Sequence, residues 1–304
     1  MAQLIKLQDY ISRYEWNAFR YPSQYIRFKQ ENWKKLKYLW ANPPKDEPVT
    51  EPITKSKWKS LFKREEEVKQ SEEKPSIYNN LPKTEVDLKF YFLDKLLPVQ
   101  LKWATSTVTE VSFMDKKFER DLQLKYFLQR FPDTYLLMYY PIFRIKEAPI
   151  DGEIILISPV GIEIIYVMDE DRRANIYIID DRSWEIRQGD STKKILSPVI
   201  ALKRTEMIIQ SILRQKNIDF PVKKVILARN NTITSVVEPY NTTIIDKNRH
   251  EDWFTEKRSL VSPLKNTQLK AVEQILLNCQ TTSVRRPEWE EDNDQIQFVD
   301  EVEK

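Results

Sequence analysis

The sequence contains very little glycine, cysteine and histidine, and each scarcity excludes a class of protein. Its 304 residues include three glycines, one cysteine and one histidine. The single cysteine, Cys279, excludes an internal disulfide and a cysteine metal cluster. The single histidine, His250, argues against a histidine metal site and a serine–histidine triad. Its polar neighbours predict an exposed position in a loop.

Long hydrophobic runs and a strong net charge are also missing. No apolar run approaches the roughly 20 residues that a membrane-spanning helix needs, so we expect no membrane span. The first residues lack the apolar core of a signal peptide. The net charge of +3 is too small to indicate nucleic-acid binding by itself. We therefore expect a protein of the reducing cytoplasm.

The glycines mark the most informative stretch of the chain. All three lie between residues 150 and 190, at Gly152, Gly161 and Gly189. A chain so poor in glycine is expected to use it only in turns with positive φ or where backbones approach closely. Two short apolar runs, 154–157 and 162–167, flank Gly161 and predict two buried strands joined by a turn.

Composition divides the chain into four expected segments. They are residues 1–42, an aromatic and basic helical segment; 43–80, a charged, proline-containing linker with a short helix around Trp58; 81–280, an α/β domain with its core at 115–230; and 281–304, an acidic disordered tail.

The α/β domain shows alternating helical and strand periodicity. We expect helices at 87–97, 115–131, 198–213 and 266–278, and strands at 135–145, 154–157, 162–167, 175–179, 183–187, 222–228 and 236–245. This order predicts an α/β fold in which a mixed central sheet is flanked by helices, with an added helical N-terminal segment.

Acidic residues at the start of a core strand are the candidate chemical site. Asp151 and Glu153 are two residues apart, which predicts that they project from one face of a strand. Glu119, on the preceding helix, is placed to reach the same edge. Three carboxylates are suitable Mg²⁺ ligands, and such a metal activates water in phosphodiester hydrolysis. The alternative is structural: Asp151 forms a turn with Gly152, and Glu119 is a surface charge.

A series of short motifs then follows in a characteristic order. They are Phe118-Glu119, Arg130-Phe131-Pro132, Asp151-Gly152-Glu153, Ser158-Pro159-Val160-Gly161, Ser183-Trp184-Glu185 and Ser197-Pro198-Val199-Ile200-Ala201. In this order they resemble the nuclease-related domain (NERD) family, a bacterial-type branch of the PD-(D/E)XK nuclease superfamily. The resemblance extends over residues 118–213 and implies a restriction-endonuclease-like fold.

The resemblance also implies where the catalytic residues of the family would lie, and there the chain departs from it. Active relatives carry Glu-x-Lys five and seven residues after the glycine of the turn, where this chain has Tyr166 and Met168. A neutral phenol is a poor Mg²⁺ ligand and a thioether is soft and uncharged. We therefore predict a catalytically degenerate protein without a cofactor, a binding or interaction module in DNA-related metabolism rather than an enzyme.

Two alternatives remain open. The first is a metal-dependent nuclease with a rearranged site, in which Glu119, Asp151 and Glu153 bind Mg²⁺ and Lys203 replaces the lost lysine. Asp169 and Glu163 are poor substitutes for the lost acid, since alternation along the strand turns them away from Tyr166. The second is a scaffold that binds a partner chain through its N-terminal helix or its acidic tail.

The N-terminal segment suggests a binding surface of its own. Trp33 and Trp40 fall on one helical stripe, with Lys34 and Lys37 at its edges. Aromatic and basic side chains together suit single-stranded nucleic acid, a protein partner or an anionic membrane surface. They suit equally well a helix that docks on the neighbouring domain and leaves its lysines in solvent.

Overall fold

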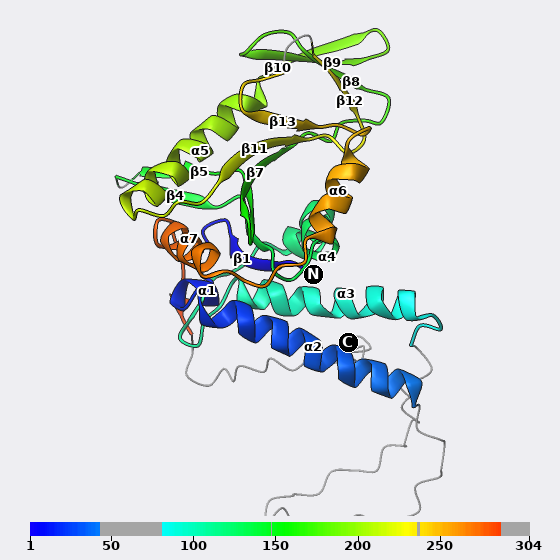
Figure 1. Ribbon diagram of the computed structural model, residues 1–304, viewed down its shortest axis with the longest axis vertical. Coiled ribbons are helices and arrows are strands. Elements are labelled where there is room, and N and C mark those ends of the chain that lie inside the picture. The colour runs from blue at the N-terminus through cyan, green and yellow to red at the C-terminus, as the bar shows by residue number, and fades with distance from the viewer. Residues whose placement is uncertain (43–80, 147, 236–237, 287–304) are drawn as a thin grey trace, which may run out of the picture.

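The computed structural model describes residues 1–42, 81–146, 148–235 and 238–286 (Figure 1). The expected linker at 43–80, with its helix around Trp58, and the acidic tail from residue 287 onward lie outside the described residues. Within the described residues, no helix is long and apolar enough to cross a membrane.

A central sheet of six strands organises the molecule. In spatial order its strands are β1 (Gln3–Leu7), β3 (Leu136–Tyr139), β6 (Ile154–Ser158), β7 (Gly161–Val167), β11 (Val222–Leu227) and β13 (Thr242–Ile245). The strands β3, β6 and β7 form an antiparallel meander, whereas β7, β11 and β13 run parallel to one another. Residues 154–157 of β6 are all apolar because both faces of that strand are buried.

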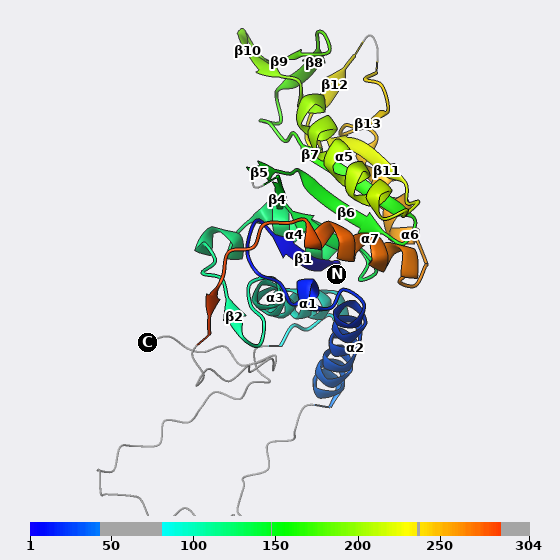
Figure 2. The same cartoon turned by 90° about the vertical axis from the view of Figure 1, so that its left-hand side faces the viewer.

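Helices cover both faces of this sheet (Figures 1 and 2). On one face lie α5 (Pro198–Gln215) and α7 (Asn266–Leu277); on the other lie α3 (Glu85–Trp103), α4 (Leu122–Arg130) and α6 (His250–Ser259). Alternate residues of each strand supply the two cores, as with Ile155 on the α5 side and Ile154 on the α4 side. This architecture confirms the predicted fold class.

A second, smaller sheet lies beyond the carboxyl end of β7 (Figure 1). Its strands, in spatial order, are β10 (Ser191–Leu196), β9 (Ser183–Gln188), β8 (Asn175–Ile178) and β12 (Thr232–Thr234). The β8–β9 hairpin confirms the hairpin predicted from the alternating pattern at 175–187. Trp184 of β9 is completely buried, and this tryptophan joins the sheet to the core on the α5 side.

The first residues of the chain form a strand of the central sheet, which the sequence did not predict. β1 pairs in parallel with β3, and every one of its residues is buried. After it come the short helix α1 (Arg13–Trp16) and the long helix α2 (Arg20–Ala41). The expected helical N-terminal segment is thus present in α1 and α2, whereas the residues before it, Gln3–Leu7, belong to the main sheet.

The aromatic stripe of α2 docks on α3. The ring of Trp33 packs against Phe92 with centroids 5.3 Å apart, and the Trp40 indole N–H donates to the Pro82 carbonyl at 2.7 Å. Lys37 forms an exposed ion pair with Glu85 at 3.1 Å, and Lys34 is exposed. Among the alternatives that the sequence left open, the structure shows that Trp33 and Trp40 pack against the neighbouring part of the protein.

Two expected elements are interrupted in the structure. The predicted helix 115–131 divides into a 3-10 turn (Lys116–Glu119) and α4, because the Asp121 side chain caps α4 by accepting from the Gln123 and Leu124 amides. The predicted strand 135–145 divides into β3 and β4 (Ile142–Ile145), because Tyr140 has φ of 49° and precedes a proline.

Two short antiparallel pairs complete the strands of the described residues. β4 pairs with β5 (Ala148–Asp151), and β2 (Glu110–Val111) pairs with β14 (Val284–Arg285). The predicted late strand at 236–245 begins only at Thr242 in β13. Residues 236–237 lie outside the described part of the chain.

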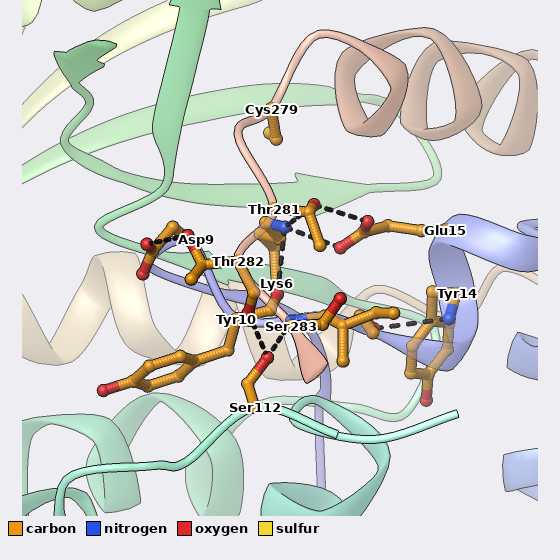
Figure 3. A network of polar contacts seen from close by, with 12 residues as sticks. Lys6, Asp9, Tyr10, Tyr14, Glu15, Ser112, Cys279, Thr281, Thr282 and Ser283 are labelled. Atoms are coloured by element: carbon orange, nitrogen blue, oxygen red, sulfur yellow. Dashed lines mark hydrogen bonds and ion pairs between the residues drawn. The ribbon is translucent and has the colours of Figure 1, made fainter. Parts of the chain in front are cut away.

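The C-terminal segment from Cys279 onward is tied to the N-terminus by a polar network (Figure 3). The Lys6 ammonium, fully buried on β1, donates to Glu15 at 2.6 Å, to Thr281 at 2.8 Å and to the Tyr10 carbonyl at 2.9 Å. The Thr281 hydroxyl donates in turn to Glu15 at 2.7 Å. Residues 281–286 are thus an ordered part of the fold, which corrects the expected start of the tail at 281.

Candidate functional site

The candidate site lies where β6 begins and β7 ends. Ile154 of β6 pairs with Ile165 of β7, so the next step of the same antiparallel register places Glu153 opposite Tyr166. By strand alternation both side chains lie on the face that α5 covers, the face of Ile155 and Ile164. The structure thus brings together two of the residues singled out from the sequence.

The turn before Glu153 explains why this position needs Gly152. A Cβ built on Gly152 would lie 2.6 Å from the Phe143 ring and 3.0 Å from the Pro141 carbonyl. The Gly152 amide also donates to that carbonyl at 2.8 Å. Asp151 ends β5 and is exposed, whereas Glu153 is half-buried beyond the turn. The expectation that the two acids project from one strand face is wrong, because the chain changes strand between them.

Helix α5 supplies the basic side of the site. The Thr205 hydroxyl accepts from the Glu153 amide at 3.1 Å, which fixes the start of β6 against the helix. Burial raises the pKa of the Glu153 carboxyl above its ordinary value; the positive charge of Arg204 opposes that rise, and Asp151 adds to it. A half-buried carboxyl with a raised pKa beside a cation is typical of a group that transfers protons.

The start of α4 and the end of β3 form the other side. The Asp121 carboxylate accepts from the Tyr139 hydroxyl at 2.8 Å, and the Gln123 amide donates to the Tyr140 hydroxyl at 3.0 Å. Asp121 also holds the first turn of α4 through its capping bonds. Because Tyr140 has positive φ, its backbone directs the chain out of β3 at this edge.

The two tyrosines of the site keep their protons at neutral pH. Burial raises the pKa of the Tyr140 hydroxyl, and the negative charge of Glu153 adds to the rise although the bond from Gln123 opposes it. Burial likewise raises the pKa of Tyr166, and Glu153 and Glu170 add to the rise. Both hydroxyls are therefore protonated and can donate hydrogen bonds. The negative charge of Glu153 contributes to the raised pKa of each.

A second polar cluster lies at the neighbouring strand end. Asp169, after β7, accepts from the Arg229 guanidinium at 2.7 Å, and Arg229 stacks over Tyr126 of α4 at 4.3 Å. The Tyr126 hydroxyl and the His250 ring nitrogen are 2.8 Å apart. His250 begins α6 and stacks on Phe254, so the expected exposed loop histidine is wrong. Burial and Arg229 lower the pKa of His250.

Three predicted site residues lie away from Glu153. Glu119 is exposed on the 3-10 turn and lines a different cavity, next to Arg286. Met168 is buried in the core, and its amide donates to the Leu227 carbonyl at 2.8 Å. Lys203 lines a cavity beside the second sheet. It is Arg204, the next residue of α5, whose charge acts on Glu153.

The residues do not match the ligand set that the nuclease resemblance implies for Mg²⁺. Among the described residues, no three histidine, cysteine, aspartate or glutamate side chains are placed to hold a metal ion together. Glu119, Asp151 and Glu153 therefore do not form the predicted cluster. The nuclease resemblance implies a carboxylate at Tyr166, and a neutral phenol is a weak ligand for a hard cation.

Comparison with known proteins gives one partial similarity. The chain is 36% identical over 113 residues to an RNA 2',3'-cyclic phosphodiesterase of Geobacillus stearothermophilus, and the match covers 33% of this chain and 36% of the relative. The chain thus spans about a third of the length of that relative. No family model matches the chain, and no solved structure matches it significantly.

This similarity corrects the functional prediction made from the sequence. A degenerate binding module was expected because Tyr166 and Met168 stand where the nuclease resemblance implies an acid and a lysine. The relative is named for a catalytic activity on a phosphodiester, which contradicts that expectation. The expectation was wrong because it relied on two positions alone, and an acid and a lysine missing at Tyr166 and Met168 do not exclude catalysis by other residues.

Proposed function

We propose that the protein is a phosphoesterase that hydrolyses a phosphodiester, with RNA ending in a 2',3'-cyclic phosphate as its substrate class. The similarity to the Geobacillus stearothermophilus phosphodiesterase carries this proposal. The Glu153 edge of the sheet supports it, since the Glu153 carboxyl, whose pKa is raised by burial, is within electrostatic range of the Arg204 guanidinium and of the Tyr140 and Tyr166 hydroxyls. The proposal makes RNA the nucleic-acid partner of the chain.

In the proposed reaction Glu153 acts as the general base. It takes a proton from a water molecule whose oxygen forms a bond to phosphorus, while the bond from phosphorus to one ribose oxygen breaks. The released ribose oxygen takes a proton from solvent, and Glu153 later returns its proton to solvent. Arg204 attracts the phosphate and stabilises the charge that develops on it, and the Tyr166 hydroxyl donates to a phosphoryl oxygen.

The single histidine of the chain limits the mechanism. A reaction carried by two imidazoles, one as acid and one as base, is impossible here. His250 is bonded to Tyr126 at 2.8 Å and lies in the neighbouring cluster. Glu153 is a carboxyl whose pKa is raised by burial, and a raised pKa makes a carboxylate a stronger base.

We also propose that the core belongs to the nuclease-related branch of the PD-(D/E)XK superfamily. The order α4, β3, β6, β7, α5 and β11 supports this, because it repeats the helix, three strands, helix and strand in which the motifs occur. The register counted from Gly161 supports it as well, since it places Tyr166 beside Glu153. On this proposal the chain keeps the family's site and uses different residues in it.

An RNA oligonucleotide ending in a 2',3'-cyclic phosphate tests the activity. The purified full chain, with and without EDTA, should open the ring to a monophosphate that chromatography resolves. Glu153→Gln should lower kcat by about 100-fold or more with little change in KM, because a general base contributes roughly that much. Absence of ring opening by the unmodified protein in either condition would contradict the proposal.

A matched control uses a half-buried carboxylate of the neighbouring strand β7. Glu163, at the opposite end of that strand, pairs with Lys257 at 2.6 Å and takes no part in the proposed site. Glu163→Gln should leave kcat and KM of the folded protein unchanged, with circular dichroism to verify folding. Equal losses in the two variants would show that a general effect on the sheet, and not proton transfer by Glu153, accounts for the change.

A further inference from the structure

Helix α2 has an exposed face that takes no part in the proposed hydrolysis. In two perpendicular views α2 lies at the outside of the molecule, with α3 on its inner side and no described helix or strand beyond it (Figures 1 and 2). The inner side is occupied, since Tyr25 and Leu36 are buried and Trp33 packs on Phe92. The outer side is therefore the part of α2 that can meet another molecule.

Cations repeat along this outer side at a helical spacing. Arg20, Arg27 and Lys34 are seven residues apart from one another, and all three are exposed. Because seven residues make almost two turns of an α-helix, the three positions fall on one line, with about 10.5 Å from each to the next. Lys35, which is also exposed, lies beside the end of that line. The outer face of α2 is thus a basic track about 21 Å long.

The charge of this track is not neutralised by the rest of the described residues. Two other lysines of the helix are paired, Lys29 with Asp133 and Lys37 with Glu85. The four cations of the track form no ion pair with any described residue; they are Arg20, Arg27, Lys34 and Lys35. Glu31 is the one acidic residue between residues 20 and 41. A surface with such an excess of positive charge attracts a polyanion.

An exposed aromatic ring lies at the end of the track. Tyr38 follows Lys34 by four residues, so it lies one turn further along the same side of the helix, and it is 69% exposed. Cations in a row with an exposed aromatic ring are the combination that binds single-stranded nucleic acid, because the phosphates meet the cations while a base stacks on the ring.

The polar residues of the outer face argue against a lipid surface. Ser23, Gln30 and Glu31 are exposed between the first cation and Tyr38. A helix that lies in a membrane interface needs a continuous apolar face to insert. In α2 the apolar residues, Tyr25 and Leu36 among them, are buried on the inner side instead. The exposed composition therefore favours a chain of phosphates over a membrane.

We propose that the outer face of α2 binds the single-stranded part of the RNA, with phosphates along Arg20, Arg27 and Lys34 and a base stacked on Tyr38. The choice of RNA as the occupant rests on the proposed function, in which Glu153 acts on the cyclic phosphate at the RNA end. The track holds nucleotides that precede this end and takes no part in bond breaking. Its contacts are the same before and during the reaction, so they lower KM and leave kcat unchanged.

Fluorescence anisotropy with the full chain tests binding separately from hydrolysis. The probe is a labelled oligouridine of about 20 nucleotides with an ordinary 3'-hydroxyl, measured between about 50 and 200 mM KCl. The double variant Arg27→Gln, Lys34→Gln should weaken binding about 10-fold. It should also reduce the slope of log K against log salt by about 1.4, because each phosphate contact on a single strand contributes about 0.7.

A matched double variant removes the same charge elsewhere. Lys193 and Lys194 are exposed on β10, at the end of the molecule opposite α2 (Figure 1). Lys193→Gln, Lys194→Gln should change neither the affinity nor the salt slope. Equal effects of the two double variants would show that net charge alone attracts the RNA and would overturn the proposal, as would the absence of any complex with the unmodified protein.

The aromatic end of the track and the nature of the occupant need their own variants. Tyr38→Ala should weaken the oligouridine about 5-fold or more, and Tyr38→Phe, which keeps the ring, should retain the affinity. No loss in a folded Tyr38→Ala would contradict the stacked base. Vesicles that contain phosphatidylserine are the alternative occupant: if the unmodified protein binds them and not the oligouridine, the track is a membrane surface and the proposal is wrong.

Kinetics with two substrates separate this proposal from the proposed function. Both end in a 2',3'-cyclic phosphate; one is a dinucleotide, too short to extend along α2, and the other has about 20 nucleotides. Arg27→Gln, Lys34→Gln should raise KM about 10-fold for the long RNA alone and leave kcat unchanged for both. Ring opening with an unchanged KM would overturn the track and leave the activity standing. Loss of oligouridine binding in this variant, in a protein that opens neither substrate, would support the track and contradict the activity.

Discussion

Two polar clusters on the same sheet show how differently a buried charge can be used. Around Lys6 every bond of the ammonium has a protein partner, and the network holds three chain segments together (Figure 3). Around Glu153 the carboxyl is only half-buried, and its interactions with Arg204 and Tyr166 are electrostatic. A satisfied cluster stabilises a fold, whereas an unsatisfied one is available to a ligand.

The sharpest test of this contrast removes the buried cation. Lys6→Met should lower the free energy of unfolding by about 3 kcal/mol, because it leaves Glu15 without its charged partner. Denaturant unfolding measures this change. Glu153→Gln should change stability far less while it removes activity. If the two substitutions destabilise equally, the distinction between a structural and a functional cluster is wrong.

A smaller effect is expected at the turn that presents Glu153. Gly152→Ala places a methyl group 2.6 Å from the Phe143 ring, so the ring or the turn must move. We expect a loss of about 2 kcal/mol, typical of overpacking, and a fall in activity because Glu153 shifts with the turn. Gly161→Ala is the control: its Cβ would be 3.1 Å from the Pro221 carbonyl, so its cost in stability should be smaller. A neutral Gly152→Ala would contradict the close approach.

The ionisation of Glu153 should make both the stability and the activity of the protein depend on pH. Its pKa is raised in the folded state, so its contribution to stability is present below the ordinary value of 4.5 and is lost as pH rises through the folded pKa. Unfolding measured across that interval should show this loss, and Glu153→Gln should remove it. As a general base Glu153 must be ionised, so kcat/KM should rise with pH over the same interval. A kcat/KM that falls there would contradict its assigned role.

The smallest effect should come from an exposed ion pair. Lys37 Nζ and Glu85 Oε1 are 3.1 Å apart on the surface of α2 and α3. The exposed fractions of the two side chains are 48% and 43%. Lys37→Ala should change the free energy of unfolding by less than about 0.5 kcal/mol, because solvent screens such pairs. A loss as large as that of Lys6→Met would show that burial is not what distinguishes the two ion pairs.

Much of the central sheet could be predicted from local pattern. The apolar runs of β6, β7 and β11 and the helical periodicity of α5 were sufficient to predict these elements. In each of them the buried residues follow the spacing of a strand or of a helix. β1 was missed because its sequence includes Gln3 and Lys6, both completely buried. Lys6 is tolerated only because Glu15 and Thr281 meet it, and no local pattern reveals such distant partners.

The site was predicted in part for similar reasons. Counting from Gly161 singled out Tyr166, and the strand register places this residue opposite Glu153. Arg204 was missed in favour of Lys203, because the rotation of α5 is set by the contact between Thr205 and the Glu153 amide. Gln123 was missed because the break that lets Asp121 cap α4 interrupts an otherwise continuous helical pattern.

The hydrogen bonds that join Lys6 and Ser112 to Thr281 and Thr282 have a consequence for the synthesis of the protein. Lys6 reaches a hydroxyl 275 positions later, and Ser112 reaches the Thr282 carbonyl across 170 positions. During translation β1 therefore leaves the ribosome long before the residues that complete its surroundings. Contacts of such wide separation form late and slowly. The strand partner of β1, β3, is made well before residue 281, but a chain that stops before Thr281 leaves Lys6 without the bond that Thr281 supplies.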